Sequence, residues 1–144
     1  MATSILTNSP AETESLGQSW GRTAKRGLVI ALSGDLGAGK TQLVKGIARG
    51  LDIMARVHSP SFTLVNVYTG GRLTLFHLDL YRLETPEQIL SAGLEEYLKP
   101  EGITVIEWAE RMAPDEFPME NFRKVTIEIL SENERRISYE DSGA

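Results

Sequence analysis

The sequence predicts an α/β protein whose central sheet mixes parallel and antiparallel strands and has helices on its faces. The apolar run 28–32 and the stretch 103–106, which is apolar except for one threonine, contain β-branched residues and are typical of strands covered on both faces, as in parallel sheets. Two further strand-like stretches flank Thr69-Gly70-Gly71 and predict an antiparallel hairpin, because glycine tolerates the positive φ of a tight turn. Both kinds of pairing are therefore expected in one sheet.

The first half of the chain should form a helix, a strand, a glycine-rich loop and a second helix. Ser9 can cap the first helix, and Pro10 suits its first turn. The apolar run 28–32 leads directly into the glycine-rich loop, and the apolar residues of 43–51 keep helical spacing. This order of strand, loop and helix is the context that a phosphate-binding loop needs.

The second half should contribute a hairpin over 62–81, a helix that begins near Thr85, and the apolar strand over 103–106. A final hairpin is expected to turn at 131–133, and the last residues, 140–144, are expected to form a frayed tail. The residues of this hairpin that should face the core are Val125, Ile127, Ile129, Ile137 and Tyr139.

Composition limits the possible functions. A length of 144 residues fits one domain, which we expect to span residues 1–144. The formal charge of −5 argues against strong direct nucleic-acid binding, which usually needs a basic surface. The absence of cysteine excludes disulfides and thiolate metal sites, and no segment approaches the length of a membrane span. A soluble protein of the cytoplasm is therefore expected.

The loop after the first strand matches G-x-x-x-x-G-K-[ST], the pattern of a P-loop. Its glycines allow successive backbone N–H groups to point into one cavity, and the following helix adds its positive N-terminal end. Lys40 is expected to reach the β- and γ-phosphates, and the Thr41 hydroxyl to bind Mg²⁺. The predicted fold is thus a three-layer sandwich of the P-loop NTPase type. The residues predicted to bind the nucleotide phosphates are Gly34, Asp35, Leu36, Gly37, Ala38, Gly39, Lys40 and Thr41.

Carboxylates at the ends of neighbouring strands are expected to complete such a site, because Mg²⁺ takes one or two of them. Glu107 directly follows the apolar run 103–106, and Asp79 lies at the polar end of its strand. We predict that both act in catalysis, with Glu107 near Mg²⁺ and Asp79 at Mg²⁺ or in water activation. Either could instead cap a helix or pair with a surface base, and their division of labour stays open.

Ser59, Ser61 and Thr63 lie where nucleotide switch proteins carry the segment that senses the γ-phosphate. A plain strand entry explains the same residues equally well, since the proline between the two serines only forces an extended backbone. His77 is more often a satisfied strand histidine than a base. Trp108 could cover the nucleotide or anchor the core, and the hairpin end around Glu132 to Arg136 predicts a solvated turn.

Four segments taken together, GDLGAGKT, SPSFTLV, HLDLYR and IEWAER, resemble the TsaE family, also called YjeE. The resemblance spans nearly the whole chain and implies a small bacterial P-loop ATPase. Such ATPases are required for threonylcarbamoyl modification of adenosine in transfer RNAs that read codons beginning with A. It also implies ATP or ADP as the bound nucleotide, Thr41 and Glu107 at Mg²⁺, Asp79 needed for hydrolysis, and Trp108 near the nucleotide. Thr13 and Arg135 would border the base. One departure is Ser61, where the family usually has threonine.

The resemblance further implies partner proteins. In the family's reaction, a TsaC-type enzyme makes the threonylcarbamoyl-adenylate and TsaD, paired with TsaB, performs the transfer. The TsaE-like subunit docks on the TsaD–TsaB pair and hydrolyses ATP weakly to sustain turnover. Two other functions stay open on the residues alone: a nucleotide-gated assembly factor without hydrolysis, and a small-molecule kinase with the same loop. The kinase would need an arginine-bearing lid, for which the chain leaves little length.

Overall fold

The computed structural model describes residues 2–35, 37–57, 64–112, 117–118 and 120–142. Within these residues one sheet of seven strands forms, in the order β1-β7-β6-β2-β5-β4-β3. The strands are β1 (Thr3–Thr7), β2 (Val29–Gly34), β3 (Val65–Tyr68), β4 (Leu75–Asp79), β5 (Ile103–Glu107), β6 (Phe122–Ile129) and β7 (Arg135–Ser142). The helices are α1 (Pro10–Thr23), α2 (Lys40–Gly50) and α3 (Pro86–Ser91), with short 3₁₀ turns η1 (Glu95–Leu98) and η2 (Ala109–Arg111).

The sheet has a parallel centre and antiparallel margins. β2 pairs in parallel with β6 on one side and β5 on the other, and β5 pairs in parallel with β4. Antiparallel pairs close both margins, with β3 beside β4, and with β7 between β6 and β1. The prediction of a mixed sheet is therefore confirmed. The carboxyl ends of the four parallel strands meet at one edge, which is where α/β sheets bind their ligands.

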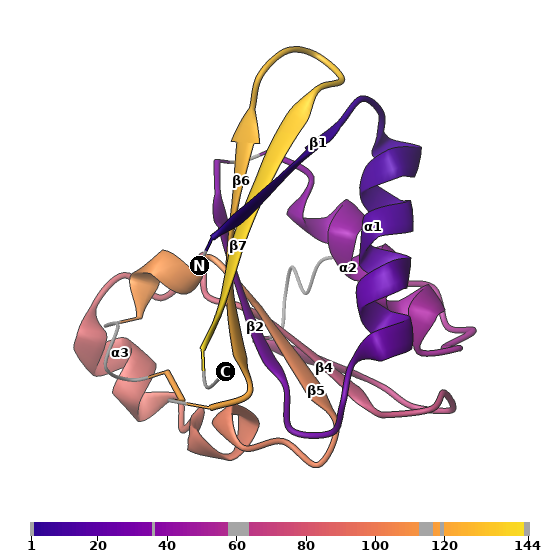
Figure 1. Cartoon of the computed structure of the whole chain (residues 1–144). Coiled ribbons are helices and arrows are strands. Elements are labelled where there is room, and N and C mark those ends of the chain that lie inside the picture. Colours follow the sequence, from indigo (N-terminus) through magenta and orange to yellow (C-terminus); the bar gives the residue numbers. More distant parts are fainter. Residues whose placement is uncertain (1, 36, 58–63, 113–116, 119, 143–144) are drawn as a thin grey trace.

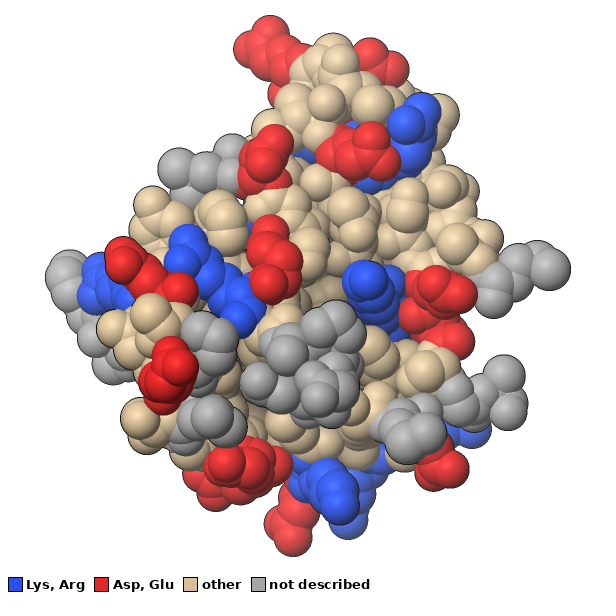
Figure 2. All heavy atoms as spheres, turned by 90° about the vertical axis from the view of Figure 1, so that its left-hand side faces the viewer, with Lys and Arg blue, Asp and Glu red and all other residues tan. Residues whose placement is uncertain are grey.

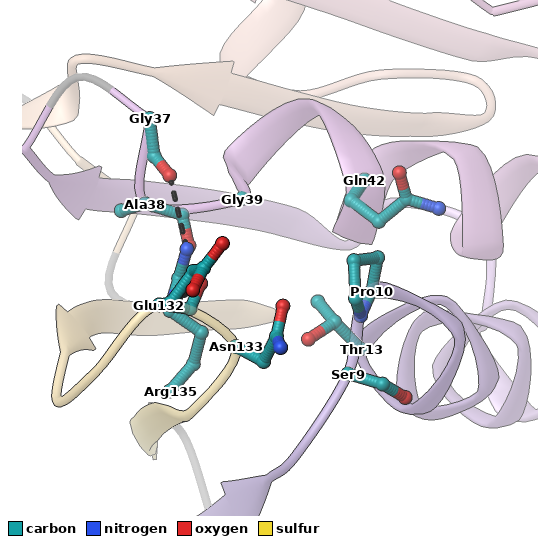
Figure 3. Close-up of a pocket in the computed structure, with 10 residues that line it drawn as sticks. All are labelled: Ser9, Pro10, Thr13, Gly37, Ala38, Gly39, Gln42, Glu132, Asn133 and Arg135. Carbon is teal, nitrogen blue, oxygen red and sulfur yellow. Dashed lines mark hydrogen bonds between the residues drawn. The ribbon is translucent and has the colours of Figure 1, made fainter.

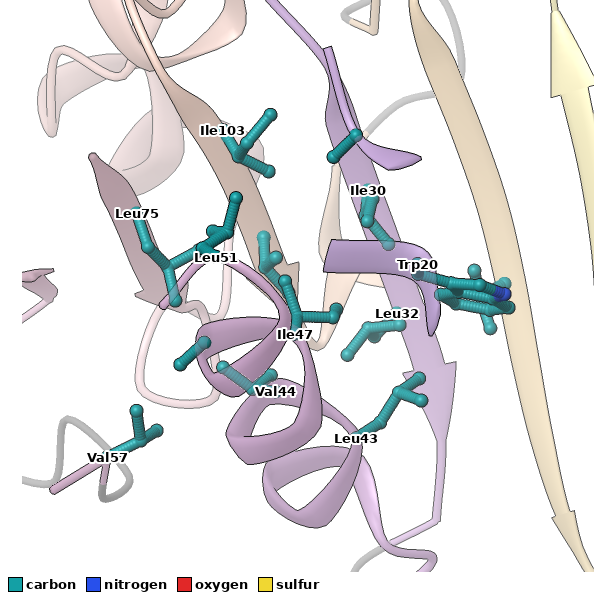
Figure 4. Close-up of a cluster of buried hydrophobic side chains, with 14 of the residues drawn as sticks. Trp20, Ile30, Leu32, Leu43, Val44, Ile47, Leu51, Val57, Leu75 and Ile103 are labelled. Carbon is teal, nitrogen blue, oxygen red and sulfur yellow. The ribbon is translucent and has the colours of Figure 1, made fainter. Parts of the chain in front are cut away.

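Helices cover both faces of the parallel centre, so the predicted three layers are present (Figure 1). On one face α1 and α2 pack against the sheet, and on the other lie α3 and the two 3₁₀ turns. The α2 side is the larger core, and Figure 4 shows α2 lying against β2 with Trp20 of α1 at its flank. Aliphatic side chains dominate this core, among them Ile30, Leu32, Leu43, Ile47, Leu51, Leu75 and Ile103.

Helices α1 and α2 approach each other along two pairs of glycines. A Cβ atom at Gly17 or Gly21 of α1 would lie 2.3 or 2.2 Å from a carbonyl oxygen of α2. A Cβ atom at Gly46 or Gly50 of α2 would lie 2.0 or 2.2 Å from a carbonyl oxygen of α1. Only glycine permits this close contact. The contact fixes the start of α1 beside the start of α2, where the glycine-rich loop ends.

Three local predictions need correction. Strand β1 was not expected, although it pairs with β7 over its whole length. Residues 140–142 are not a frayed tail, because they pair with residues 122–124 of β6. Ile129 was expected to face the core but is 47% exposed, since it lies near the solvent end of the hairpin. None of the described helices has the length and apolar composition that a membrane crossing needs.

Candidate functional site

The loop between β2 and α2 has the backbone of an anion-binding loop. Gly37 and Gly39 have φ values of 81° and 101°, which glycine adopts without strain. Ala38 closes the turn by donating its N–H to the Asp35 carbonyl oxygen over 3.0 Å. Helix α2 follows directly, and among the described residues no side chain caps its N-terminus. Its first N–H groups therefore remain available to a bound anion, and the helix dipole favours negative charge there.

Lys40 lies buried at the start of α2 and is folded back onto the protein. Its Nζ donates to the Gly34 carbonyl oxygen over 2.5 Å and lies 3.6 Å from the centroid of the Trp108 ring. Burial lowers the pKa of Lys40 below its usual 10.5, while the nearby carboxylates of Glu110, Glu107 and Asp79 act in the opposite direction. The site thus holds a desolvated ammonium group on an aromatic face, with acidic groups around it.

Glu107 ends β5 as a buried carboxylate and is only 3% exposed. The parallel register places it beside Leu32 of β2, two residues before Gly34, where the loop begins. Its Oε2 atom accepts a hydrogen bond from the Thr41 hydroxyl over 3.4 Å and is also hydrogen-bonded to His77 Nε2. The first residues of α2 and the end of β5 therefore meet at this carboxylate.

Asp79 ends β4 directly beside Glu107 in the parallel register. Its Oδ1 accepts a hydrogen bond from the Tyr81 backbone N–H over 2.9 Å, which fixes the carboxylate at the strand end. Because alternate residues of a strand share a face, Asp79 and His77 both lie on the α2 side of the sheet. Asp79 and Glu107, which the sequence places at the ends of two strands, therefore lie side by side at one edge of the sheet.

The oxygen donors at this edge suit Mg²⁺ when a phosphate completes its coordination. Mg²⁺ prefers one or two carboxylates together with substrate oxygens and water, rather than a cage made by protein alone. Thr41, Glu107 and Asp79 offer a hydroxyl and two carboxylates. In the described part of the chain no group of three or more His, Cys, Asp or Glu residues could hold a metal by itself. The donor set therefore fits a metal that arrives with a nucleotide.

Aromatic and basic side chains lie beside the carboxylates. Trp108 adopts the left-handed conformation, with φ 59°, and this turns its ring over Lys40. The Trp108 and Tyr81 rings lie 4.9 Å apart, and the Arg111 guanidinium is 5.8 Å from the centroid of each. Trp108 is half-buried against the α3 side of the core, so it contributes both to the core and to the wall of the site.

A second cavity, of about 160 Å³, adjoins the loop (Figure 3). Three separate segments line it: the start of α1, the loop with the first turn of α2, and the turn between β6 and β7. Its volume is below the roughly 300–1,000 Å³ of typical ligand pockets, so it suits one part of an elongated ligand. The lining residues are Ser9, Pro10, Thr13, Gly37, Ala38, Gly39, Gln42, Glu132, Asn133 and Arg135.

Arg135 ties the β6–β7 turn to the loop. Its Nε donates to the Ala38 carbonyl oxygen over 3.0 Å, and one of its terminal nitrogens reaches the Gly37 carbonyl oxygen at 3.4 Å. The other terminal nitrogen donates to carbonyl oxygens of the turn itself, at Ser131, Glu132 and Glu134. The expectation of a purely solvated hairpin end is wrong for Arg135, because its guanidinium is used in these contacts.

Comparison with known proteins identifies the family. The model of the family "Threonylcarbamoyl adenosine biosynthesis protein TsaE" matches residues 7–137, nearly the whole chain. The chain belongs to the TsaE family. A Bacillus subtilis protein named tRNA threonylcarbamoyladenosine biosynthesis protein TsaE is 39% identical over 133 residues, covering 92% of this chain and 82% of that protein. A Nostoc protein of the same name is 51% identical over 114 residues, covering 76% of this chain and 70% of that protein.

A solved structure extends the agreement to three dimensions. The crystal structure of YdiB from Bacillus subtilis resembles this chain with a TM-score of 0.83 and 34% identity. The match covers 99% of this chain and 87% of that one. The resemblance to the TsaE family drawn from the four sequence segments is therefore confirmed, as is the α/β fold of the P-loop type.

The predicted site residues of this TsaE family member fall into two groups around the loop. Lys40, Thr41, Glu107, Asp79 and Trp108 meet at the carboxyl edge of the parallel strands, and Thr13 and Arg135 line the second cavity. Leu36 and the predicted switch residues, Ser59, Ser61 and Thr63, lie outside the described residues.

Sequence reasoning missed Gln42 and Asn133 in the cavity, and it did not connect His77 with Glu107. No local signal marks Asn133, because only the packing of distant segments brings the hairpin turn to the loop. The position of His77 on the strand that ends at Asp79 was a usable signal, since both lie on the face that α2 covers.

Proposed function

We propose that this protein binds and hydrolyses ATP with Mg²⁺ to support threonylcarbamoylation of adenosine in transfer RNAs that read codons beginning with A. Residues 1–144 would act as one P-loop ATPase domain in the cytoplasm. The observation that supports this most directly is the meeting of Lys40, Thr41 and two strand-end carboxylates beside a helix N-terminus that no described side chain caps. Membership of the TsaE family supplies the biological setting.

The loop residues Gly34 to Thr41 would hold the phosphates through backbone N–H groups. Lys40 would leave the Trp108 ring and the Gly34 carbonyl oxygen to meet the β- and γ-phosphate oxygens. Thr41 and Glu107 are the proposed Mg²⁺ ligands, with Asp79 at the metal or at the attacking water. When bound, Mg²⁺ would neutralise the charge that develops on the phosphate oxygens.

Hydrolysis by this chain's residues would depend on position and charge rather than on covalent chemistry. Asp79 would orient a water molecule toward the γ-phosphorus. The water oxygen forms a bond to phosphorus while the bond to the β-phosphate oxygen breaks, so that ADP leaves and the proton passes to phosphate. Ser59, Ser61 and Thr63 would sense the γ-phosphate. Turnover by the isolated protein should be slow, and partner binding would complete the site.

The second cavity is the proposed site of the adenine base and its sugar. It adjoins the phosphate loop through Gly37 and Ala38, so a ligand with its phosphates in the loop would extend into it. Thr13 and Arg135 would border the base there. Trp108 lies beside Lys40, where it would cover the phosphates instead.

TsaD and TsaB are the proposed partners, with a TsaC-type enzyme in the same pathway. We propose that this chain docks on the TsaD–TsaB pair and that ATP hydrolysis allows the complex to turn over repeatedly. Strong direct RNA binding is not proposed. The chain has a net charge of −5, and acidic and basic side chains are interspersed on the face in Figure 2 rather than separated into a basic patch.

A reconstituted modification assay tests the proposal. Transfer RNA, the TsaC-type enzyme, TsaD and TsaB are combined with and without this chain, under single-turnover and multiple-turnover conditions. We expect the chain to be needed for multiple turnover. Lys40→Ala and Thr41→Ala should each lose this ATP-dependent activity while the fold stays intact. Full activity of these variants would reject the assignment. Calorimetry with ATP and Mg²⁺ on the same folded proteins shows whether binding is lost.

Asp79→Ala separates hydrolysis from nucleotide-gated assembly. If ATP must be hydrolysed, the variant should bind ATP but fail to sustain turnover. If it binds ATP and restores modification fully, hydrolysis is dispensable and nucleotide occupancy alone holds the complex. Measuring ADP formation in the same reactions distinguishes the two functions.

A further inference from the structure

His77 is a buried polar residue that the proposed mechanism does not use. Its side chain is fully buried on β4, two residues before Asp79 and beneath the start of α2. Burying an imidazole among aliphatic side chains is unfavourable unless its nitrogens find partners. One nitrogen, Nε2, is hydrogen-bonded to Oε2 of Glu107, whereas Nδ1 has no partner among the described residues. The ring therefore contacts Glu107 through one nitrogen, while the burial of the other nitrogen, Nδ1, without a described partner is unfavourable.

The contact restricts the Glu107 carboxylate. Within the described residues, the two hydrogen bonds of that side chain, one with the Thr41 hydroxyl and one with His77 Nε2, both involve Oε2. The His77 ring itself is held by β4, where its neighbours in the sheet are Val105 and Asn66. Oε2 is thus fixed from the core side, which leaves Oε1 for a ligand at the strand edge.

We propose that His77 is a positioning residue that donates an Nε2–H hydrogen bond to Glu107 and so orients this carboxylate toward a cation bound with the nucleotide. The inference rests on the proposed function, because Glu107 is there a Mg²⁺ ligand. Residues that hydrogen-bond a metal ligand fix its orientation, and their loss typically lowers metal affinity by about 10–100-fold. A ring that serves only to fill the core would leave metal affinity unchanged.

Nucleotide affinity measured with and without the metal provides the test. The dissociation constant of ADP is determined by calorimetry in EDTA and in excess Mg²⁺, and the ratio of the two values is compared between proteins. His77→Leu should lower the gain from Mg²⁺ by about 10-fold or more, with affinity in EDTA unchanged. His77→Gln should keep most of the gain, because the glutamine amide can donate in place of Nε2.

Thr104→Val is the matched control. Thr104 is also fully buried in the sheet, and its Oγ1 likewise lacks a hydrogen-bond partner in the described part of the chain. Its neighbours in the sheet, Phe76 and Val29, belong to the cluster on the α3 side, away from Glu107. Its substitution should leave the ratio at the wild-type value. An equal loss in Thr104→Val would overturn the proposal, because any change in the core would then suffice.

A nitrogen NMR spectrum of the wild-type protein reads the protonation of the ring directly, and a variant is needed only to assign the signal. The chain has two histidines, so the His77 signal is the one that disappears in His77→Gln. The proposal requires the proton on Nε2, and a ring protonated on Nδ1 alone would overturn it. A wild-type ratio in His77→Leu would overturn it as well. Absence of ADP binding in the wild-type protein would instead reject the proposed function itself.

Discussion

The phosphate end and the base end of the proposed nucleotide site are built in different ways. At the phosphate end, three of the polar side chains are buried, since Lys40, His77 and Glu107 are each no more than 5% exposed, while Thr41 and Asp79 are half-buried. They come from the ends of neighbouring parallel strands and from the first turn of α2. At the base end, Glu132 and Asn133 are exposed, and Arg135 donates its hydrogen bonds to backbone carbonyl oxygens.

This difference indicates where each half gains its specificity. A buried charge interacts strongly with its neighbours and is costly to leave unpaired, so each side chain at the phosphate end should matter individually. Exposed side chains at the base end should each contribute little. There the shape of the cavity, set by the packing of α1 against α2 and by the hairpin turn, should matter more than any one side chain. Substitutions at the two ends should therefore differ in size and in kind.

The largest effect is expected at Glu107. Glu107→Gln keeps the size of the side chain but removes its charge, so we expect ATP hydrolysis in the presence of partners to fall by about 100-fold. ADP release is measured at saturating ATP and Mg²⁺. Glu110→Gln is the control, because Glu110 is an exposed carboxylate that also lies near Lys40. Equal losses of ATP hydrolysis in both variants would mean that the total negative charge near Lys40, and not the buried Glu107 carboxylate in particular, determines the rate.

At the base end, the contact between α1 and α2 should respond to added volume. Gly46→Ala would place a Cβ atom 2.0 Å from the Glu14 carbonyl oxygen, so the helices must separate. We expect the free energy of unfolding to fall by about 1–3 kcal/mol, with weaker ADP binding because the start of α1 moves away from the loop. Denaturant unfolding and calorimetry measure the two changes.

Lys45→Ala, one position earlier in α2, serves as the comparison for Gly46→Ala. It changes a half-exposed side chain without adding volume between the helices. Its free energy of unfolding should stay within about 0.5 kcal/mol of the wild-type value. A Gly46→Ala protein of wild-type stability would show that the helices can separate at little cost, and the cavity would then not depend on this contact.

The pH dependence of nucleotide binding should also distinguish the phosphate end from the base end. Burial lowers the pKa of Lys40 in the free protein, and bound phosphates should raise it again. Between these two pKa values the complex holds more protons than the free protein, so binding takes up a proton. Affinity is therefore greatest below the lowered pKa and falls as the pH rises above it, by up to about tenfold per unit.

Calorimetry in two buffers with different ionisation enthalpies measures this proton uptake. Lys40→Arg should remove the pH dependence even if it binds more weakly, because a guanidinium keeps its charge throughout this range. Substitutions at the base end should leave the pH dependence as it is in the wild-type protein. A pH dependence that survives in Lys40→Arg would mean that another group takes up the proton.

The same contrast explains what the sequence could predict. The phosphate end is encoded locally: the loop is one contiguous motif, and Glu107 and Asp79 each follow an apolar strand pattern. Once the strands are parallel, their carboxyl ends meet at one edge, so the two carboxylates could be placed together. The mixed sheet was predictable for a similar reason, because continuous apolar runs and a glycine turn mark the two kinds of pairing.

The remaining features depend on contacts between distant parts of the chain. Strand β1 is short and carries few apolar residues, so only its pairing with β7 defines it. In the same way, residues 140–142 belong to β7 because they pair with β6, although their polar sequence suggested a tail. Strand periodicity puts His77 on the same face as Asp79, but the contact of His77 with Glu107 and that of Arg135 with Ala38 each join two separate elements, so spacing alone does not give the partner. Local periodicity carries no information about such pairs.

The smallest effects should come from single side chains in the cavity. Arg135→Ala removes the hydrogen bonds to Gly37 and Ala38, so we expect ADP affinity to fall by about 1 kcal/mol, roughly fivefold. The rate of hydrolysis at saturating ATP should barely change, because the carboxylates lie at the other end. Asn133→Ala, in an exposed residue of the same turn, should alter affinity by no more than about 0.5 kcal/mol.

Comparing ATP with GTP in these two variants sharpens the contrast. Arg135→Ala should weaken both nucleotides alike, since Arg135 supports the loop backbone that both would share. If Asn133→Ala instead weakened ATP by tenfold and left GTP unchanged, an exposed side chain would be reading the base directly. The base end would then resemble the phosphate end, where single side chains decide, and the distinction between a cavity set by packing and a site set by buried charges would no longer hold.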